Sequence, residues 1–342
     1  MPATLTSPLM GCVLRPDPAD ASSSRTRFNS CCHREQTETR WIVSLPFASQ
    51  TRQSVCVASC CSPLLPLHER LRYTLAMEVI TLQSGSSGNC VFVRSANTRL
   101  LFDAGISGSK AQSRLAEFGY DIRDCDALIL SHEHSDHICG AGVFHRKFGL
   151  PVYANQRTWN ATRAKSSTGC IGSPNHFVSG EPFQIGSLRI ETLRTPHDAI
   201  EGVCFVIEDT ESRQRFGLLT DLGHVFSGLE ELIDGLDAVL LESNYDDQML
   251  LSGPYPQPLK DRIAGHGGHI SNDDAAQLLD RCDASRLQWV CLGHLSAHNN
   301  SPDVALATHY ERNGDRFSIF CADRDGATRL PRIKPITATS PV

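Results

Sequence analysis

The hydrophobic pattern of the chain changes at Met77. Residues 1–76 show no sustained periodicity, whereas from Met77 onward short apolar runs alternate with turns and with amphipathic segments. Apolar runs of this length, separated by turns and helices, are typical of an α/β protein. The pattern predicts strands over residues 78–82, 90–94, 99–102, 127–130, 216–220, 238–241 and 289–292, with two or three more within 183–207.

Three amphipathic segments have the start and stop signals of helices. The segments 109–118 and 138–148 are followed by Gly119 and Gly149, and glycine commonly ends a helix. The third, 271–282, begins at Ser271 with Asp274 three residues later, which predicts a capping box.

The ordered pattern stops near Pro331, so we expect a single domain over 77–331 and a loose tail over 332–342. Hydrophobic residues make up 40% of the 342 residues and charged residues 20%, a balance that allows a packed core. The longest apolar run falls short of the roughly 18 residues that cross a bilayer, which excludes an integral membrane protein.

The first 76 residues differ from the rest in composition as well as in pattern. They hold eight Arg, five acidic residues and six of the 14 Cys, and they lack the charged start and apolar centre of a signal peptide. Their cysteine spacing fits no zinc motif. We therefore expect 1–76 to be a disordered extension, or translated sequence upstream of a true start at Met77.

The remaining chain holds 24 Lys and Arg against 33 Asp and Glu, a net charge of −9. This charge argues against nucleic-acid binding by bulk electrostatics, although a local basic groove stays compatible with it. The other eight cysteines lie mostly on apolar elements, which predicts reduced thiols and a cytoplasmic protein.

Most of the predicted strands end at a histidine or a carboxylate. The carboxyl ends of strands are where α/β sheets build their sites. Carboxylates gathered alone would repel one another, and histidines with divalent cations remove that conflict. The residues at these ends are Asp103, His132, His197, Asp221, Glu242 and His294.

The strongest local signal is His132-x-His134-x-Asp136-His137. On a tight loop between strand and helix, His132 and His134 can face one cation while Asp136 and His137 face a second. Imidazole and carboxylate suit Zn²⁺, and also Mn²⁺ or Fe²⁺. The simpler alternative is a polar surface loop.

This motif and the distant partners resemble the metallo-β-lactamase superfamily. The resemblance implies an αββα four-layer sandwich, with two sheets face to face, helices outside and two divalent cations at one edge. In that family His132, His134 and His197 would hold one cation, and Asp136, His137 and His294 the other. It also implies that Asp221 bridges them together with a water or hydroxide, and that Asp103 supports the site.

The subfamily bears on the substrate. Lactamases proper usually carry cysteine at the position of Asp221, which disfavours antibiotic hydrolysis, while glyoxalase II shares the aspartate. The segments around Gly268 and His294 look like ribonuclease Z. A closer similarity is to the YycJ/WalJ family, which implies a 5′ to 3′ exonuclease on double-stranded DNA. That similarity rests on SGSSGN at 84–89, HEHSDHICG at 132–140, TDLG at 220–223, ESNYD at 242–246, GHIS at 268–271 and LGHLSAHNN at 292–300.

Phosphodiester hydrolysis needs a base, an acid and charge neutralisation, and the sequence offers a candidate for each. Asp136 can orient or deprotonate the attacking water. His269 precedes the capped helix, whose start offers N–H groups to a phosphate, so it can bind phosphate or protonate the leaving oxygen. Glu242 can hold that imidazole in its charged form. The alternative is that His269 only caps the helix.

The remaining expectations concern the substrate. Ser86 and Asn89 in the Gly-rich turn, and Asn299 after His294, are candidate substrate contacts or simply turn formers. Lys260 and Arg262 either touch DNA phosphates or lie on a solvated helix face. The main rival function is a small-molecule hydrolase of the thioester or lactone type. A third is a catalytically silent metal-binding scaffold that acts through unknown protein partners.

Overall fold

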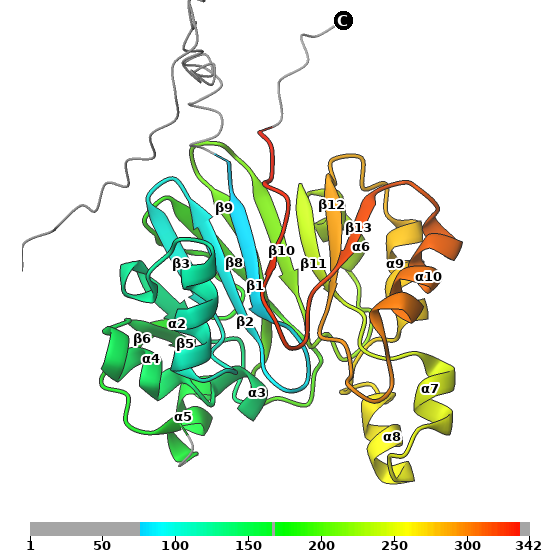
Figure 1. The fold of residues 1–342 in the computed structure, drawn as a ribbon, viewed down its shortest axis with the longest axis horizontal. Helices are drawn as coiled ribbons and strands as arrows, with labels where there is room; N and C mark the ends of the chain where they lie inside the picture. Colours follow the sequence, from blue (N-terminus) through cyan, green and yellow to red (C-terminus); the bar gives the residue numbers. More distant parts are fainter. Residues whose placement is uncertain (1–75, 166–167, 336–342) are drawn as a thin grey trace, which may run out of the picture. The chain divides into compact units, whose positions relative to one another are not determined.

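The computed structural model describes residues 76–165 and 168–335, which form two mixed β-sheets with helices around them (Figure 1). The expectations for residues 1–75 and 336–342 lie outside the described residues. In spatial order, the first sheet consists of β14 (Thr328–Arg329), β1 (Glu78–Gln83), β2 (Cys90–Ser95), β3 (Thr98–Phe102), β4 (Ala127–Ile129), β5 (Val152–Asn155) and β6 (Asn175–Phe177). The second consists of β13 (Ser318–Cys321), β12 (Trp289–Gly293), β11 (Ala238–Glu242), β10 (Arg215–Leu219), β9 (Val203–Asp209), β8 (Leu188–Arg194) and β7 (Phe183–Ile185).

The strands at the centre of each sheet are buried on both faces. In β11, Leu240 packs between the sheets, while Leu241 packs on the opposite face with the helices. In β3, Phe102 packs between the sheets, and Leu101 packs on the outer face with the helices. Strands that are covered on both sides have no polar face, which is why they appear in the sequence as continuous apolar runs.

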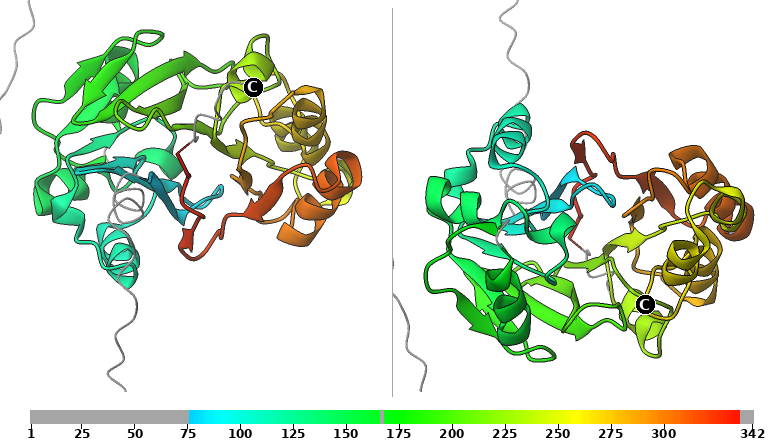
Figure 2. Two further views of the ribbon diagram at one scale, coloured as in Figure 1. Left: turned by 90° about the horizontal axis from the view of Figure 1, so that it is seen from above. Right: turned by 90° about the horizontal axis from the view of Figure 1, so that it is seen from below.

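Helices cover the outer face of each sheet and complete four layers, which confirms the predicted αββα sandwich (Figure 2). The first sheet is covered by α2 (Gly108–Glu117), α4 (Ala141–Phe148) and α5 (Gln156–Ala164). The second is covered by α6 (Leu229–Asp234), α9 (Asn272–Arg281) and α10 (Pro302–Asn313). The shorter helices are η1 (Ile122–Asp124), α3 (Ser135–Ile138), α7 (Asp247–Ser252) and α8 (Gln257–Ile263). Of the described helices, none is long and apolar enough to cross a bilayer.

The helix predicted over 138–148 is divided into α3 and α4. The break falls at Gly140, whose N–H donates to the Ala104 carbonyl at 2.7 Å. A Cβ at this position would lie 2.2 Å from the Ile106 carbonyl oxygen, so only glycine allows this approach. The prediction was therefore wrong at its start, because this long-range backbone contact separates Ile138 from α4, and right at its end, because Gly149 caps α4.

The ordered chain also continues beyond the boundary expected at Pro331. Ile333 is fully buried and forms an antiparallel bridge with Met77. The side chain of Gln214 contacts both residues of this bridge. Its Oε1 accepts from the Met77 N–H and its Nε2 donates to the Ile333 carbonyl, each at 2.7 Å. The start of the expected tail thus belongs to the fold.

Candidate metal centre

Several of the predicted strand-end residues have unusual backbone conformations. Asp103 follows β3, Asp221 comes shortly after β10 and His294 follows β12, and their φ angles are 60°, 56° and 55°. Positive φ is uncommon for residues with a side chain and is often found at functional sites. The chain leaves each strand sharply at these positions.

A close backbone approach fixes the loop that carries the motif. The Asn89 N–H donates to the Asp136 carbonyl at 2.8 Å, and the Gly105 N–H donates to the Asn89 carbonyl at 2.8 Å. A Cβ on Gly105 would lie 1.6 Å from the Asp136 carbonyl oxygen. The loop after β3 must therefore carry glycine here for α3 to take its place.

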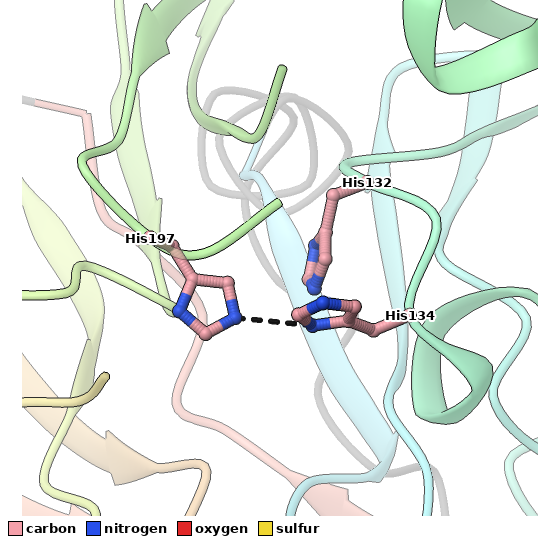
Figure 3. A group of neighbouring side chains, drawn as sticks. All are labelled: His132, His134 and His197. Carbon is pink, nitrogen blue, oxygen red and sulfur yellow. Dashed lines mark hydrogen bonds between the residues drawn. The ribbon is translucent and has the colours of Figure 1, made fainter. Parts of the chain in front are cut away.

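His132, His134 and His197 form the first group of candidate ligands, with ring nitrogens within 4.8 Å of one another (Figure 3). His197 Nε2 lies 3.1 Å from His134 Nδ1. The other ring nitrogen of His197 donates to the Gly268 carbonyl at 2.8 Å, and Nδ1 of His132 lies 2.9 Å from Ser131 Oγ. We refer to these three residues as the histidine trio.

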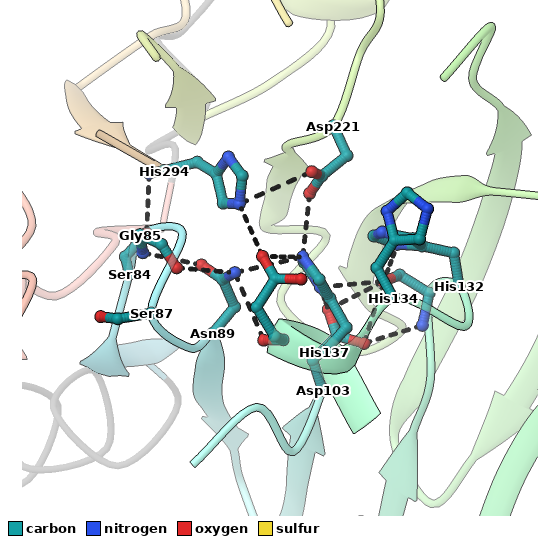
Figure 4. A network of polar contacts seen from close by, with 12 residues as sticks. Ser84, Gly85, Ser87, Asn89, Asp103, His132, His134, His137, Asp221 and His294 are labelled. Atoms are coloured by element: carbon teal, nitrogen blue, oxygen red, sulfur yellow. Dashed lines mark hydrogen bonds and ion pairs between the residues drawn. The ribbon is translucent and has the colours of Figure 1, made fainter. Parts of the chain in front are cut away.

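A second group lies beside the trio and contains Asp136, His137 and His294. Asp221 contacts both groups, and Figure 4 shows its contacts with His137 and His294 of the second group. Its Oδ2 lies 3.3 Å from His137 Nε2, and its Oδ1 lies 3.5 Å from His294 Nε2 and 3.7 Å from His197 Nε2. This central place suits the bridging role that the resemblance implied.

The donor set fits divalent cations. His132 Nε2, His294 Nε2 and Asp221 Oδ2 are buried and have no hydrogen-bond partner among the described residues, and buried polar atoms are rarely left so. Outer partners orient the rings, as is usual for metal-binding histidines. His137 donates from Nδ1 to Asp103 at 2.7 Å, which directs its Nε2 toward Asp221.

The pKa values of the histidines differ between the two groups. Burial, together with charge on neighbouring histidines, lowers the pKa of both His132 and His134, which keeps their lone pairs available. Burial opposes charge on His137, but Asp221 and Asp103 outweigh it and raise the pKa of His137 to about 9. Asp221 likewise raises the pKa of His294 against the effect of burial. A cation that binds there must displace protons.

His269 and Glu242 form a pair next to these groups. His269 Nδ1 lies 2.6 Å from Glu242 Oε1, and the buried Glu242 also accepts from the Leu222 N–H at 2.7 Å. Burial opposes ionisation of Glu242, but charge and hydrogen bonding from His269 lower its pKa. A ligand role for His269 is a second possibility. It has metal-ligand spacing to Glu242, Asp221 and His294.

The start of α9 offers fewer free N–H groups than expected. Ser271 and Asp274 form the predicted capping box, in which each side chain accepts from the other's backbone N–H. The Asn272 N–H donates to the Tyr245 carbonyl at 2.8 Å. These donors are used within the protein, so His269 itself, which lines the cleft, is the better candidate for contact with a substrate.

The three predicted substrate contacts lie in different environments. Ser86 is exposed and lines the cleft. Asn89 is buried, and its Nδ2 donates to the Gly85 carbonyl and lies 3.1 Å from His137 Nε2. Asn299 is fully buried and donates to Ser296 Oγ at 3.3 Å, so it does not form part of the cleft wall.

Sequence reasoning missed three residues around the site. Asn244 donates to the His294 carbonyl at 2.7 Å and approaches His294 Nδ1 at 3.1 Å. Asp198 lies 3.7 Å from His134 Nε2, and Lys165 lines the cleft. Asp198 directly follows His197 in the sequence and Asn244 lies two residues after Glu242, which was a usable signal. Lys165 had no such signal, because only the fold brings it to the site.

Comparisons with known proteins find relatives in both sequence and fold. A sequence profile described as the Beta-lactamase superfamily domain matches residues 98–290. The chain is 37% identical over 262 residues to "Exodeoxyribonuclease WalJ" of Streptococcus pneumoniae, an alignment that covers 74% of this chain and 96% of the relative. It is 35% identical over 233 residues to "Exodeoxyribonuclease YycJ" of Bacillus anthracis, covering 68% and 87%.

Solved structures show the same fold at low sequence identity. The metallo-β-lactamase fold protein YhfI from Bacillus subtilis has a TM-score of 0.57 at 18% identity, covering 75% of this chain and all of that one. Zn²⁺-bound PqqB from Methylobacterium extorquens has a TM-score of 0.56 at 17% identity, covering 74% and 99%. At such identities the likeness establishes the fold alone.

Proposed function

The chain belongs to the Beta-lactamase superfamily, and on that premise we propose that it is a metal-dependent nuclease that degrades DNA from its ends. One observation carries the proposal. The seven candidate ligands converge at the sheet edge, in a chain that aligns with almost the whole length of a relative named exodeoxyribonuclease. Polarity from 5′ to 3′ and a preference for double strands are part of the proposal and come from the resemblance.

The metal ions are proposed as two divalent cations, with Zn²⁺ as the first candidate and Mn²⁺ or Fe²⁺ as alternatives. His132, His134 and His197 would hold one, Asp136, His137 and His294 the other, and Asp221 would contact both. Bound there, the pair would supply activation of the attacking water and neutralisation of charge on the phosphate. Zn²⁺ is favoured because imidazole nitrogens dominate the donor set.

The protein's own groups would then move the protons. His137 and His294 outweigh burial and lower the pKa of Asp136 to about 2, so its carboxylate is ionised and would orient the attacking water, while it is only a weak base toward it. Glu242 holds His269 through Nδ1, which leaves Nε2 free to donate a proton to the leaving alkoxide.

Burial raises the pKa of thiols such as Cys204, consistent with unreactive cysteines in a cytoplasmic protein.

The rival function is hydrolysis of a small thioester or lactone, which requires no basic groove. We expect the metal-loaded protein to degrade duplex DNA and to leave β-lactams intact. Hydrolysis of thioesters and lactones should be slower by orders of magnitude. The measurement is a comparison of kcat/KM across duplex DNA, RNA, a thioester, a lactone and a β-lactam at one protein concentration. Rapid thioester cleavage without any DNA degradation would replace the nuclease by the rival.

A further inference from the structure

The cleft over the metal centre has a volume of about 350 Å³, within the range of binding sites for small groups. It contains only two lysine or arginine side chains among the described residues that line it, Lys165 and Arg262. Since the chain after residue 76 carries more acidic than basic residues, attraction of a polyanion must come from locally placed cations. These two side chains are therefore the candidates.

Arg262, on α8, is held next to the histidine trio by Asp198. Its Nε donates to Asp198 Oδ2 at 2.6 Å, and Asp198 Oδ1 lies 3.6 Å from His197 Nε2 and 3.7 Å from His134 Nε2. Within the described residues, neither terminal amino group of Arg262 has a hydrogen-bond partner. The side chain is 59% exposed. The planar guanidinium is thus fixed at one edge and open at the other, where it can bind two phosphate oxygens.

Lys165 reaches the same trio from the end of α5. Its Nζ donates to the Glu133 carbonyl at 2.5 Å, and Glu133 lies between His132 and His134 in the sequence. An ammonium group has three donors, so this contact leaves two for a ligand. Helix α5 belongs to the layer on the first sheet, and α8 follows β11 of the second sheet. The Lys165 and Arg262 side chains therefore come from different halves of the fold.

We propose that Lys165 and Arg262 form a phosphate-binding subsite, which holds the phosphodiester group adjacent to the one being cleaved. The proposal rests on the nuclease function above and adds where the DNA strand lies, along the side of the centre formed by the histidine trio. The Lys165 and Arg262 side chains are each held by a group next to the histidine trio. A phosphate bound between them would therefore lie beside the phosphodiester group that is cleaved.

The competing explanation is structural: Arg262 would only neutralise Asp198, and Lys165 would only stabilise the loop that carries His134. The two explanations differ in salt dependence. A cation that contacts phosphate releases counterions from DNA, and its removal lowers the slope of log affinity against log salt by about one. A structural cation leaves that slope unchanged.

The test measures binding of a fluorescent duplex with phosphorothioate ends to the metal-loaded full-length protein, over a series of KCl concentrations. We expect Lys165→Gln and Arg262→Gln each to weaken binding on the order of tenfold and to lower the salt slope by about one. Arg262→Lys should keep the slope, because it keeps the charge. Hydrolysis of bis(p-nitrophenyl) phosphate, which has a single phosphate, should fall less in these variants than cleavage of the DNA duplex.

Matched controls lie on the same two helices. Arg163 on α5 is exposed, and Lys260 on α8 donates to the Leu251 carbonyl, and neither lines the cleft. Arg163→Gln and Lys260→Gln should bind DNA as the wild type does. Unchanged affinity and slope in both cleft variants, or loss of metal from them, would overturn the subsite. A wild type that binds the duplex with the expected slope but cleaves no DNA would overturn the nuclease proposal alone.

Discussion

Replacing His132 or Asp221 with alanine is expected to remove bound metal and DNA degradation together. Within the described part of the chain, His132 Nε2 and Asp221 Oδ2 are buried without a hydrogen-bond partner, and the Asp221 carboxylate contacts both groups of candidate ligands. Loss of a residue that merely orients a ligand costs about 10- to 100-fold in metal affinity or activity, and loss of a direct ligand should exceed that. Elemental analysis of the purified variants, paired with a nuclease assay, measures both effects.

A histidine outside the centre provides the control. His176 is exposed, its Nδ1 contacts the Ala154 carbonyl, and it is not among the described residues that line the cleft. His176→Ala should therefore keep the wild-type metal content and activity. If His132→Ala and Asp221→Ala instead retain full metal occupancy and normal rates, the ligand assignment is wrong.

The second large effect is expected at His269. His269→Ala should keep the bound metal and lose on the order of 10²–10⁴-fold in DNA cleavage, which is the usual contribution of a positioned general acid. Its contact with the buried Glu242 fixes the imidazole ring. The seven candidate ligands supply the donors for two cations without His269. The loss should be much smaller with bis(p-nitrophenyl) phosphate, because nitrophenolate departs without protonation.

Comparison of the two substrates separates the possible roles of this residue. Equal losses on DNA and on the activated diester would indicate that His269 binds phosphate and is not the acid. Loss of metal from His269→Ala would make it a ligand, as the spacing of Asp221, Glu242, His269 and His294 also permits. Each outcome contradicts the proposed acid in a different way.

The apolar runs were sufficient to predict most of the strands and the strand ends at which the candidate ligands lie, whereas the four layers came from the family resemblance. Strands covered on both faces leave continuous apolar runs, and Asp103, Asp221 and His294 follow such runs directly or after one residue. The capping box of Ser271 and Asp274 was also predictable, because both partners lie within one helical turn.

Contacts between distant residues were not predictable in this way. No residue of α8 is buried, and its two apolar residues one turn apart, Leu259 and Ile263, are too short a pattern to show that the helix lies beside the centre. The contact of Arg262 with Asp198 joins residues 64 positions apart. Only the structure therefore distinguishes Arg262, which lines the cleft, from Lys260, which does not. The burial of Asn299 could not be predicted either, because it depends on contacts between distant residues.

The central claim, a metal-dependent nuclease, is tested most directly by restoring metal to chelator-treated protein while nucleotide release from end-labelled duplex DNA is followed. We expect the metal-free protein to be inactive. Activity should return in proportion to bound cation and reach its maximum near two per chain, the number that a paired site holds. Nucleotide release that is equally fast without metal, or absent at full metal occupancy, would contradict the account.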